Sequence, residues 1–332
     1  MGRLARRAML MLFAATVVVA VAAAFHGHAR FTAPGPLMRE TTVVIPKGYT
    51  PAQIAMLLEY NGVISGGTVF AIGARLTGRD RVMRAGEYAF PAAVSMDGAI
   101  ALLTGGKTVE RRLTIAEGLT TSEVLGLVAA ADGLAGEIPE SPGEGMLLPE
   151  TYFFSFGDGR QHLVERMRDA MTKTLDELWP LRAPKLAVAT PLEAVVLASI
   201  IEKETALDSE RARISAVFHN RLRRRMRLQS DPTVAYAIAG GGGPLDRALT
   251  RRDLAVASPY NTYKARGLPP GPIANPGRAS IKAALHPGGG AELYFVADGS
   301  GGHVFARSLA EHNRNVASWR RVQRRRKRDR ER

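Results

Sequence analysis

The sequence predicts an α+β protein in three successive parts: a single N-terminal transmembrane helix, a small α/β module, and a larger mixed α+β domain. An uncharged apolar run near the N-terminus predicts the first part. A strand, a glycine turn and a capped helix occur twice in succession, which is typical of small sheet-and-helix units. Apolar helical stripes mixed with short strands predict the last part. With 332 residues, 46% of them hydrophobic, the chain can build two folded domains and an anchor.

The positive charge of the chain is concentrated at its two ends. The formal net charge is +14, but residues 320–332 hold nine Lys or Arg against two acidic residues, and Arg3, Arg6 and Arg7 add three more. We expect residues 320–332 to be a basic disordered tail. The folded middle is then only mildly basic, and with no nucleic-acid motif the charge does not indicate nucleic acid as a partner. The chain has no cysteine, which excludes disulfides and cysteine-based sites.

Residues 8–25 carry no charge and predict a transmembrane anchor. The run lies near the lower limit of about 17 apolar residues for crossing a bilayer. The arginines before it favour a cytoplasmic N-terminus, residues 1–7, and an exported remainder. Residues 26–40 are then expected to be a flexible linker. The alternative is a cleaved signal peptide, because the alanines at 20 and 22–24 offer small residues to a peptidase.

Residues 41–110 predict the small module. A strand at 42–45 precedes a capping box of Thr50 and Gln53 that starts a helix. A helix at 68–76, a strand at 86–90 and a helix at 95–103 follow. The opening pattern then recurs as a strand at 112–115 and a capping box of Thr120 and Glu123. Residues 41–110 resemble a LysM-like module, which implies binding to glycans that contain GlcNAc. The alternative is a spacer that holds the next domain away from the membrane.

The larger domain, residues 111–319, opens with this second strand and capped helix, and a loop rich in Pro, Gly and Glu follows at 136–145. An apolar strand at 147–154 is interrupted by Glu150, which either lines a sugar groove or faces solvent. The amphipathic helix at 162–178 places its apolar stripe in the core.

A core helix begins at Thr190, which is its N-cap, and ends with Glu202 and Glu204. The two glutamates lie roughly 200° apart around the helix, so they do not form a paired-carboxylate site. Glu204 continues the stripe of Val196 and Ile200. Partial desolvation there should raise the pKa of Glu204 above the usual value of about 4.3.

A carboxyl group that stays protonated near neutral pH is what a general acid needs to cleave a glycosidic bond. We therefore predict that Glu204 is the catalytic residue of a glycan-cleaving site. The alternative is that Glu204 forms an ion pair with Lys203, Arg211 or another arginine.

Polar residues near this helix are candidates for substrate binding. The next helix, at 209–224, carries Asn220 toward its end, and the arginines at 223–225 and 227 read as a solvated basic face. A polar loop follows and leads into a helix at 234–239. Segments at 258–263 and 267–276 are rich in aromatic, polar and proline residues and suit the walls of a groove. A hairpin of strands at 293–297 and 303–306 carries His303, which either reaches the groove or has a structural role. The candidates after Asn220 are Gln229, Asp231, Thr233, Tyr236, Asn261, Tyr263, Asn275 and His303.

Four long segments carry a family resemblance. They read EKETALDSERARISAVFHNRL, MRLQSDPTVAYAI, SPYNTYKARGLPPGPIANPG and YFVADGSGGHVFARSLAEHN. Together they resemble the YceG-like family of membrane-anchored endolytic murein transglycosylases, over about residues 40–320. The stretch 136–148 is less similar, which leaves the detail of that loop open. The second glutamate of the EKE motif is catalytic in this family, and it corresponds to Glu204.

The resemblance implies a LysM-like module and a catalytic domain outside the inner membrane. It implies cleavage within nascent peptidoglycan strands to give 1,6-anhydro-MurNAc ends, which would terminate strand elongation. Glycan strands and the inner membrane are the expected partners, peptidoglycan synthases are candidate partners, and no metal or other cofactor is expected. The rival functions are a muramidase, which gives reducing MurNAc ends, and a non-catalytic wall-binding scaffold.

Overall fold

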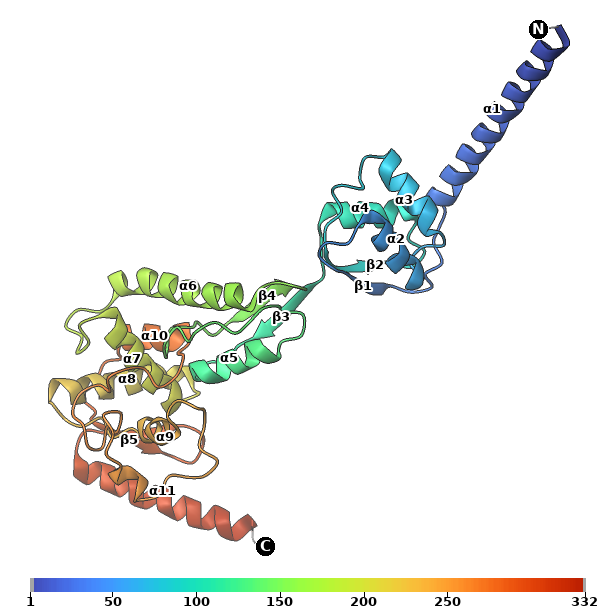
Figure 1. The fold of residues 1–332 in the computed structure, drawn as a ribbon. Helices are drawn as coiled ribbons and strands as arrows, with labels where there is room; N and C mark the ends of the chain where they lie inside the picture. The colour runs from blue at the N-terminus through green and yellow to red at the C-terminus, as the bar shows by residue number, and fades with distance from the viewer. Residues whose placement is uncertain (1–2, 331–332) are drawn as a thin grey trace. The chain divides into compact units, whose positions relative to one another are not determined.

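The computed structural model describes residues 3–330, and the side chains of residues 3–5, 327, 329 and 330 are left out of the description. Contacts divide the chain into two compact units (Figure 1). The first contains the chain up to Arg111 together with Phe154–Gly157, and the second contains Arg112–Phe153 and the chain from Asp158 onward. Each unit is described by itself.

The first unit begins with helix α1, Arg3–Thr32. Its segment Arg6–Thr32 is long and apolar enough to cross a membrane, a property that a signal sequence near an N-terminus shares. The expectation that a flexible linker begins at residue 26 is wrong, because the helix continues through Gly27 to Thr32. The physical reason is packing: Phe31, in the last turn, is only 7% exposed and belongs to the core of the module.

The module combines a two-stranded sheet with three helices. Strand β1 (Thr41–Ile45) pairs antiparallel with β2 (Gly86–Phe90), and the helices are α2 (Pro51–Tyr60), α3 (Gly67–Leu76) and α4 (Met96–Gly105). The predicted capping box is confirmed, since Thr50 and Gln53 each bond the other's backbone N–H. Inward-facing Val43 and Ile45 of β1 pack with Leu58, Phe70 and other apolar side chains into one core.

The second unit begins within a similar strand, at Arg112, and a capped helix follows. Strand β3 (Glu110–Thr114) pairs with β4 (Thr151–Ser155), and α5 (Thr121–Ala130) follows β3 with the predicted capping box of Thr120 and Glu123. The strand expected at 147–154 begins only at Thr151. Residues 147–150 are irregular because the backbone N–H of Leu147 bonds the side chain of Asn275 instead of a neighbouring strand.

Helices build the rest of the second unit. The long helix α6 spans Arg160–Leu178, and α7 spans Pro191–Glu204. Every residue of α7 from Ala194 to Ile201 is buried, so α7 is the central helix. It packs against α8 (Asp208–Arg223) and α10 (Arg278–Leu285). Helix α9 (Asp231–Ala239) starts earlier than the predicted Val234, with Pro232 in its first turn, where proline is well tolerated. Short 3₁₀ turns lie at Trp179–Leu181 and Asp253–Ala255.

The C-terminal part of the unit is a hairpin followed by a helix. Strands β5 (Tyr294–Ala297) and β6 (His303–Ala306) pair antiparallel, and α11 (Leu309–Arg330) packs beside them (Figure 1). The expectation of a disordered basic tail at 320–332 is wrong for residues 320–330, because these residues continue α11. The segment contains neither Gly nor Pro, and arginine is a good helix former. Residues 331 and 332 lie outside the described part of the chain.

Candidate active site

Glu204 is the last residue of α7, and the apolar helix places it at the edge of the core. Thr190 caps the helix through a hydrogen bond to the N–H of Glu193, and Ile200 and Ile201 are fully buried one turn before Glu204. Burial raises the pKa of the Glu204 carboxyl to about 7, and the nearby Asp231 charge adds to this rise. The direction is the one expected from the aliphatic stripe.

The other glutamate, Glu202, has a different environment. Its side chain is only 5% exposed and forms an ion pair with Arg211 at 3.3 Å. It also accepts a hydrogen bond from the N–H of Gly277 at 2.9 Å. Arg211 is therefore the partner of Glu202, and it also contacts Glu117 and Asp208. This arrangement removes Arg211 as the ion-pair partner considered for Glu204.

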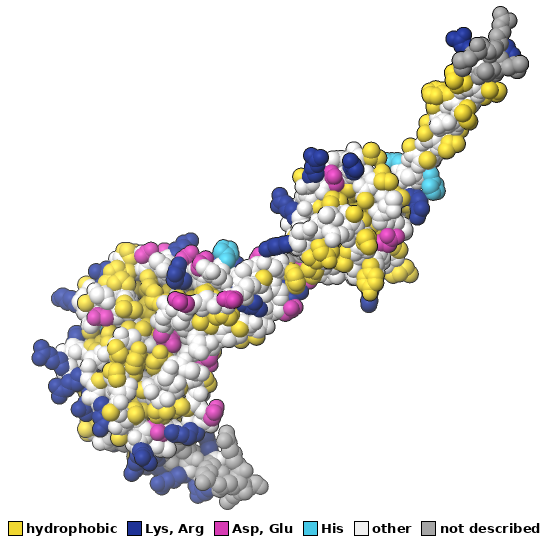
Figure 2. Space-filling view, in the orientation of Figure 1, with side chains coloured by type: hydrophobic (Ala, Val, Ile, Leu, Met, Phe, Trp, Pro, Cys, Tyr) yellow, Lys and Arg dark blue, Asp and Glu magenta, His cyan; other side chains and the backbone are white. Residues whose placement is uncertain are grey.

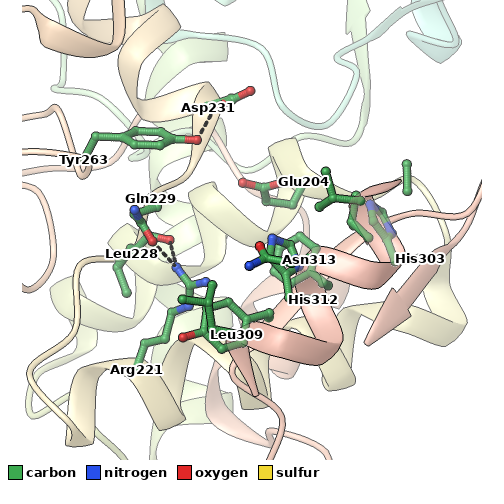
Figure 3. Close-up of a pocket in the computed structure, with 15 residues that line it drawn as sticks. Glu204, Arg221, Leu228, Gln229, Asp231, Tyr263, His303, Leu309, His312 and Asn313 are labelled. Carbon is green, nitrogen blue, oxygen red and sulfur yellow. Dashed lines mark hydrogen bonds between the residues drawn. The ribbon is translucent and has the colours of Figure 1, made fainter. Parts of the chain in front are cut away.

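A cleft of about 520 Å³ opens over Glu204 (Figure 3). Its walls come from the end of α7, the end of α8, the loop before α9, the β5–β6 hairpin and the first turns of α11. The polar side chains that line it are Glu204, Arg221, Gln229, Asp231, Tyr263, Tyr294, His303, His312 and Asn313. These segments are far apart in sequence, so the cleft exists only in the folded chain.

The loop before α9 supplies one wall of the cleft and contacts the catalytic candidate directly. Ser230 donates a short hydrogen bond from its Oγ to Oε1 of Glu204. The hydroxyl of Tyr263 donates to Oδ1 of Asp231 at 2.6 Å. Gln229 has a φ of 51°, a left-handed conformation that costs a residue other than glycine about 1 kcal/mol or more. Such strain is held in place by surrounding contacts, and Gln229 directly precedes Ser230, which bonds Glu204.

Arg221 is a buried cation under this loop. It is 7% exposed and donates to the carbonyl oxygens of Leu293 at 2.6 Å and Leu228 at 2.8 Å. It also donates to Oε1 of Gln229 at 3.3 Å, and its guanidinium lies over the ring of Tyr294. Arg221 therefore ties α8 to both the loop and β5. Its positive charge also lowers the pKa of Glu204, against the larger effect of burial.

The hairpin and α11 supply the opposite wall. His303 is held by Glu210, whose carboxylate accepts from its backbone N–H at 2.8 Å and lies 2.7 Å from its Nδ1. His312 stacks on Tyr294 with ring centroids 5.1 Å apart. Burial and the Arg221 charge lower the pKa of His312, which keeps its ring neutral near pH 7. The flat, uncharged ring of His312 suits contact with the face of a sugar.

Comparison with known proteins places the chain in a family. A model of the YceG-like family matches residues 43–318. The chain belongs to the YceG-like family.

Its relatives include proteins with an assigned activity. A Bacillus subtilis protein named endolytic murein transglycosylase is 33% identical over 301 residues, which cover 81% of this chain and 82% of that protein. A Streptococcus pneumoniae protein of the same name is 30% identical over 321 residues and is covered to 58%. The crystal structure of a yceG-like protein of Listeria monocytogenes has a TM-score of 0.51 at 32% identity, with 83% of this chain and 98% of that chain covered.

The cleft over Glu204 is lined by only some of the residues that were predicted to bind substrate. Gln229, Asp231, Tyr263 and His303 line it together with Glu204. Tyr236 instead lines a second hollow of about 310 Å³, and its hydroxyl donates to Glu144. Asp231 borders both hollows.

The other predicted contacts lie elsewhere, which corrects their assignment. Thr233, Asn261 and Asn275 are fully buried and form hydrogen bonds inside the protein, so the groove does not reach them. Asn220 bonds the carbonyl oxygens of Gly290 and Glu292 and supports the loop before β5. Glu150 is exposed and does not line the cleft. Polar residue type alone could not separate groove contacts from structural hydrogen bonds.

Sequence reasoning missed Arg221, Ser230, Tyr294, His312 and Asn313 as site residues. All five lie within the four segments that carry the family resemblance. Their position within those motifs was the sequence feature that could have indicated a role in the site. Only the tertiary structure shows which residues of each motif reach the cleft.

Asn275 provides a test of this division between structural and substrate-binding residues. Its side chain accepts from the N–H of Leu147 at 2.9 Å and donates to Thr121 and Leu119. We expect Asn275→Ala to lower the free energy of unfolding by about 2 kcal/mol or more, because a buried N–H without a partner costs about 1–3 kcal/mol. Urea unfolding measures this change. A variant with wild-type stability and a raised KM would instead show that Asn275 binds substrate.

Proposed function

We propose that this protein is an endolytic murein transglycosylase, a lyase that cleaves MurNAc-β-1,4-GlcNAc bonds within peptidoglycan strands and leaves 1,6-anhydro-MurNAc ends. The observation that carries the proposal is Glu204, a carboxyl with a pKa raised to about 7 at the base of an open cleft. The names of relatives at 30% and 33% identity support the same activity.

A single carboxyl group can perform both proton transfers of this reaction. In the first step, protonated Glu204 donates its proton to the glycosidic oxygen, the bond from C1 of MurNAc to that oxygen breaks, and the GlcNAc side leaves with a free 4-hydroxyl. In the second step, the Glu204 carboxylate takes the proton from the 6-hydroxyl of MurNAc as O6 bonds to C1. The carboxyl ends the cycle protonated, and no water is consumed.

The surrounding groups suit this use of one carboxyl. Glycosidases that hydrolyse with two carboxylates need the second one as a nucleophile or as a base for water. Asp231, which also borders the cleft, accepts a hydrogen bond from Tyr263, and its negative charge raises the pKa of Glu204. That charge favours the protonated form of Glu204, which is the form that starts the reaction. The N-acetyl group of the substrate can stabilise the positive charge at C1.

Cleavage inside a strand requires a groove that sugars can enter from both sides of the scissile bond. The cleft over Glu204 and the second hollow, which Tyr236 lines, share Asp231 at their boundary. We infer that the glycan passes Glu204 in the first hollow and continues past Asp231 into the second. Tyr236, packed 5.0 Å from Tyr260 between ring centroids, then contacts sugars on the far side of Asp231.

The first unit holds the second unit close to the peptidoglycan. In the proposed topology α1 is a retained single-pass anchor in the inner membrane, Arg3, Arg6 and Arg7 keep the N-terminus cytoplasmic, and the catalytic unit is periplasmic. The LysM-like module binds nascent glycan, and cleavage terminates strand elongation beside peptidoglycan synthases.

Product analysis tests the proposed reaction. Purified glycan strands are incubated with the full chain in detergent, and the muropeptides are separated and weighed by mass spectrometry. Internal cleavage with anhydro ends is the expected result. Reducing MurNAc ends, heavier by one water, would identify a muramidase, and uncut strands would identify a scaffold.

The pH dependence should follow the protonation of Glu204. The general acid must be protonated, so kcat/KM is expected to fall as pH rises through about 7. Ser230 donates a hydrogen bond to the Glu204 carboxyl and thereby lowers its pKa. Ser230→Ala should therefore raise that pKa and move the alkaline limb of the profile to higher pH. An unmoved or downward-shifted limb would contradict the assignment of this limb to Glu204.

A further inference from the structure

Helix α3 of the module is apolar on two faces. One face enters the core, where Phe70 and Ala74 are fully buried. The other face is turned outward and carries Ile72 and Leu76, which are 54% and 82% exposed, with half-buried Val69 at its border with the core. A helix at the surface of a water-soluble domain usually has a polar outer face. The outer face of α3 therefore fits a surrounding that is itself apolar.

This outer face forms one wall of an apolar groove of about 630 Å³. The other wall is the C-terminal third of α1, with Ala23, Ala24 and Phe31 among its lining residues. Hydrophobic side chains cover α1, and histidines mark the end that joins the module (Figure 2). The groove therefore continues the apolar surface of the proposed membrane anchor onto the module.

The contact between α1 and α3 leaves little freedom for the groove to open. Phe31 of α1 is 7% exposed and lies against Gly73 of α3. A Cβ atom on Gly73 would lie 2.2 Å from the Phe31 ring, so only glycine permits this approach. Because the last turn of α1 is part of the module core, the depth of α1 in a membrane also sets the depth of α3.

That depth follows from helix geometry. At about 1.5 Å per residue, the uncharged run of residues 8–25 is roughly 27 Å long, close to the thickness of a bilayer's hydrocarbon core. Ala23 and Ala24 then lie just inside the outer edge of the hydrocarbon. The groove between them and α3 opens at the same level. His28 and Arg30, which also line the groove, follow within two turns and reach the level of the headgroups.

We propose that this groove seats a phospholipid of the outer leaflet, with acyl chain against Val69, Ile72 and Leu76 and an anionic headgroup beside Arg30. Asp97 also lines the groove, and its charge is paired with that of Arg79. The inference rests on the proposed retention of α1 as an anchor. The module is then partly immersed in the membrane surface, in place of being suspended above it.

Fluorescent labelling of single cysteines tests the immersion, because the natural chain has no cysteine. Leu76→Cys, Met56→Cys and Val18→Cys are each labelled with an environment-sensitive fluorophore in the full chain. The proteins are reconstituted in phosphatidylethanolamine–phosphatidylglycerol vesicles, with and without lipid that is brominated along the length of its acyl chains. Met56, 70% exposed on α2, is the matched control, and Val18, within α1, reports insertion of the anchor.

The expected result is a blue-shifted emission at positions 76 and 18, with most of it lost in brominated lipid, and a water-like, unquenched emission at position 56. Quenching at 18 with water-like emission at 76 would overturn the groove proposal and leave the anchor intact. Water-like emission at 18 would overturn the anchor and the groove together. A shielded label at 76 that bromine does not quench would overturn the lipid assignment in favour of a second copy of the chain.

Discussion

Glu204→Gln is expected to lower the rate of anhydro-muropeptide release by between about a hundredfold and ten-thousandfold, the usual contribution of a general acid or base. The amide keeps the size of the side chain and can still accept the hydrogen bond from Ser230, but it cannot donate or take up the proton. Binding of uncut glycan strands should be unchanged. The measurement is mass spectrometry of muropeptides released per hour by equal amounts of wild type and variant.

Glu202→Gln is the matched control, because it changes the neighbouring carboxyl in the same helix. Glu202 faces Arg211 and Gly277, away from the cleft, so its variant should keep anhydro release per folded molecule. Loss of the product in Glu202→Gln with retention in Glu204→Gln would reverse the assignment.

The stability of Glu204→Gln provides a second readout. The folded-state pKa of Glu204 lies above its ordinary value of 4.5, so the folded wild type holds this proton longer than the unfolded chain does. Its contribution to stability is present at acid pH and is lost as pH rises from about 4.5 through about 7. The variant lacks this dependence. At pH 8 it should unfold at the same temperature as the wild type or at a higher one.

Arg221→Met is expected to lower the free energy of unfolding of the second unit by about 3 kcal/mol or more. The substitution leaves the buried carbonyl groups of Leu228 and Leu293 without a hydrogen-bond donor, and each such loss costs about 1–3 kcal/mol. Methionine preserves much of the apolar stem, so the loss reports the guanidinium. Urea unfolding followed by circular dichroism, with the full chain in detergent, measures the change.

Arg224→Met is the control for this effect. Arg224 lies three residues further along at the end of α8 but is exposed, and a surface change of this kind usually alters stability by no more than about 0.5 kcal/mol. In the fraction of Arg221→Met that remains folded, the alkaline limb of the pH profile should move to higher pH, because a positive charge that lowers the Glu204 pKa is gone. Equal stability of the two arginine variants would contradict the buried role of Arg221.

Local signals account for most of the elements. The capping boxes at Thr50 and Thr120, the N-cap at Thr190 and the spacing of apolar residues identify helix starts and buried faces, because all of these interactions lie within a few residues of each other. Two of the wrong expectations concern the residues after 25 and after 319. In the first case Phe31 is held by distant side chains of the module, and in the second an uninterrupted arginine-rich helix continues where a disordered tail was expected.

The sequence by itself determined which glutamate faces the cleft. The angle between Glu202 and Glu204 and the aliphatic stripe before Glu204 are properties of one helix, and they predict both the separation of the two side chains and the direction of the pKa shift. Tertiary structure decided which polar residues join Glu204. Asn275 and Thr233 enter the interior, whereas Arg221, Ser230 and His312 reach the site, because hydrogen bonds to partners far away in sequence place them there. No local pattern encodes those partners.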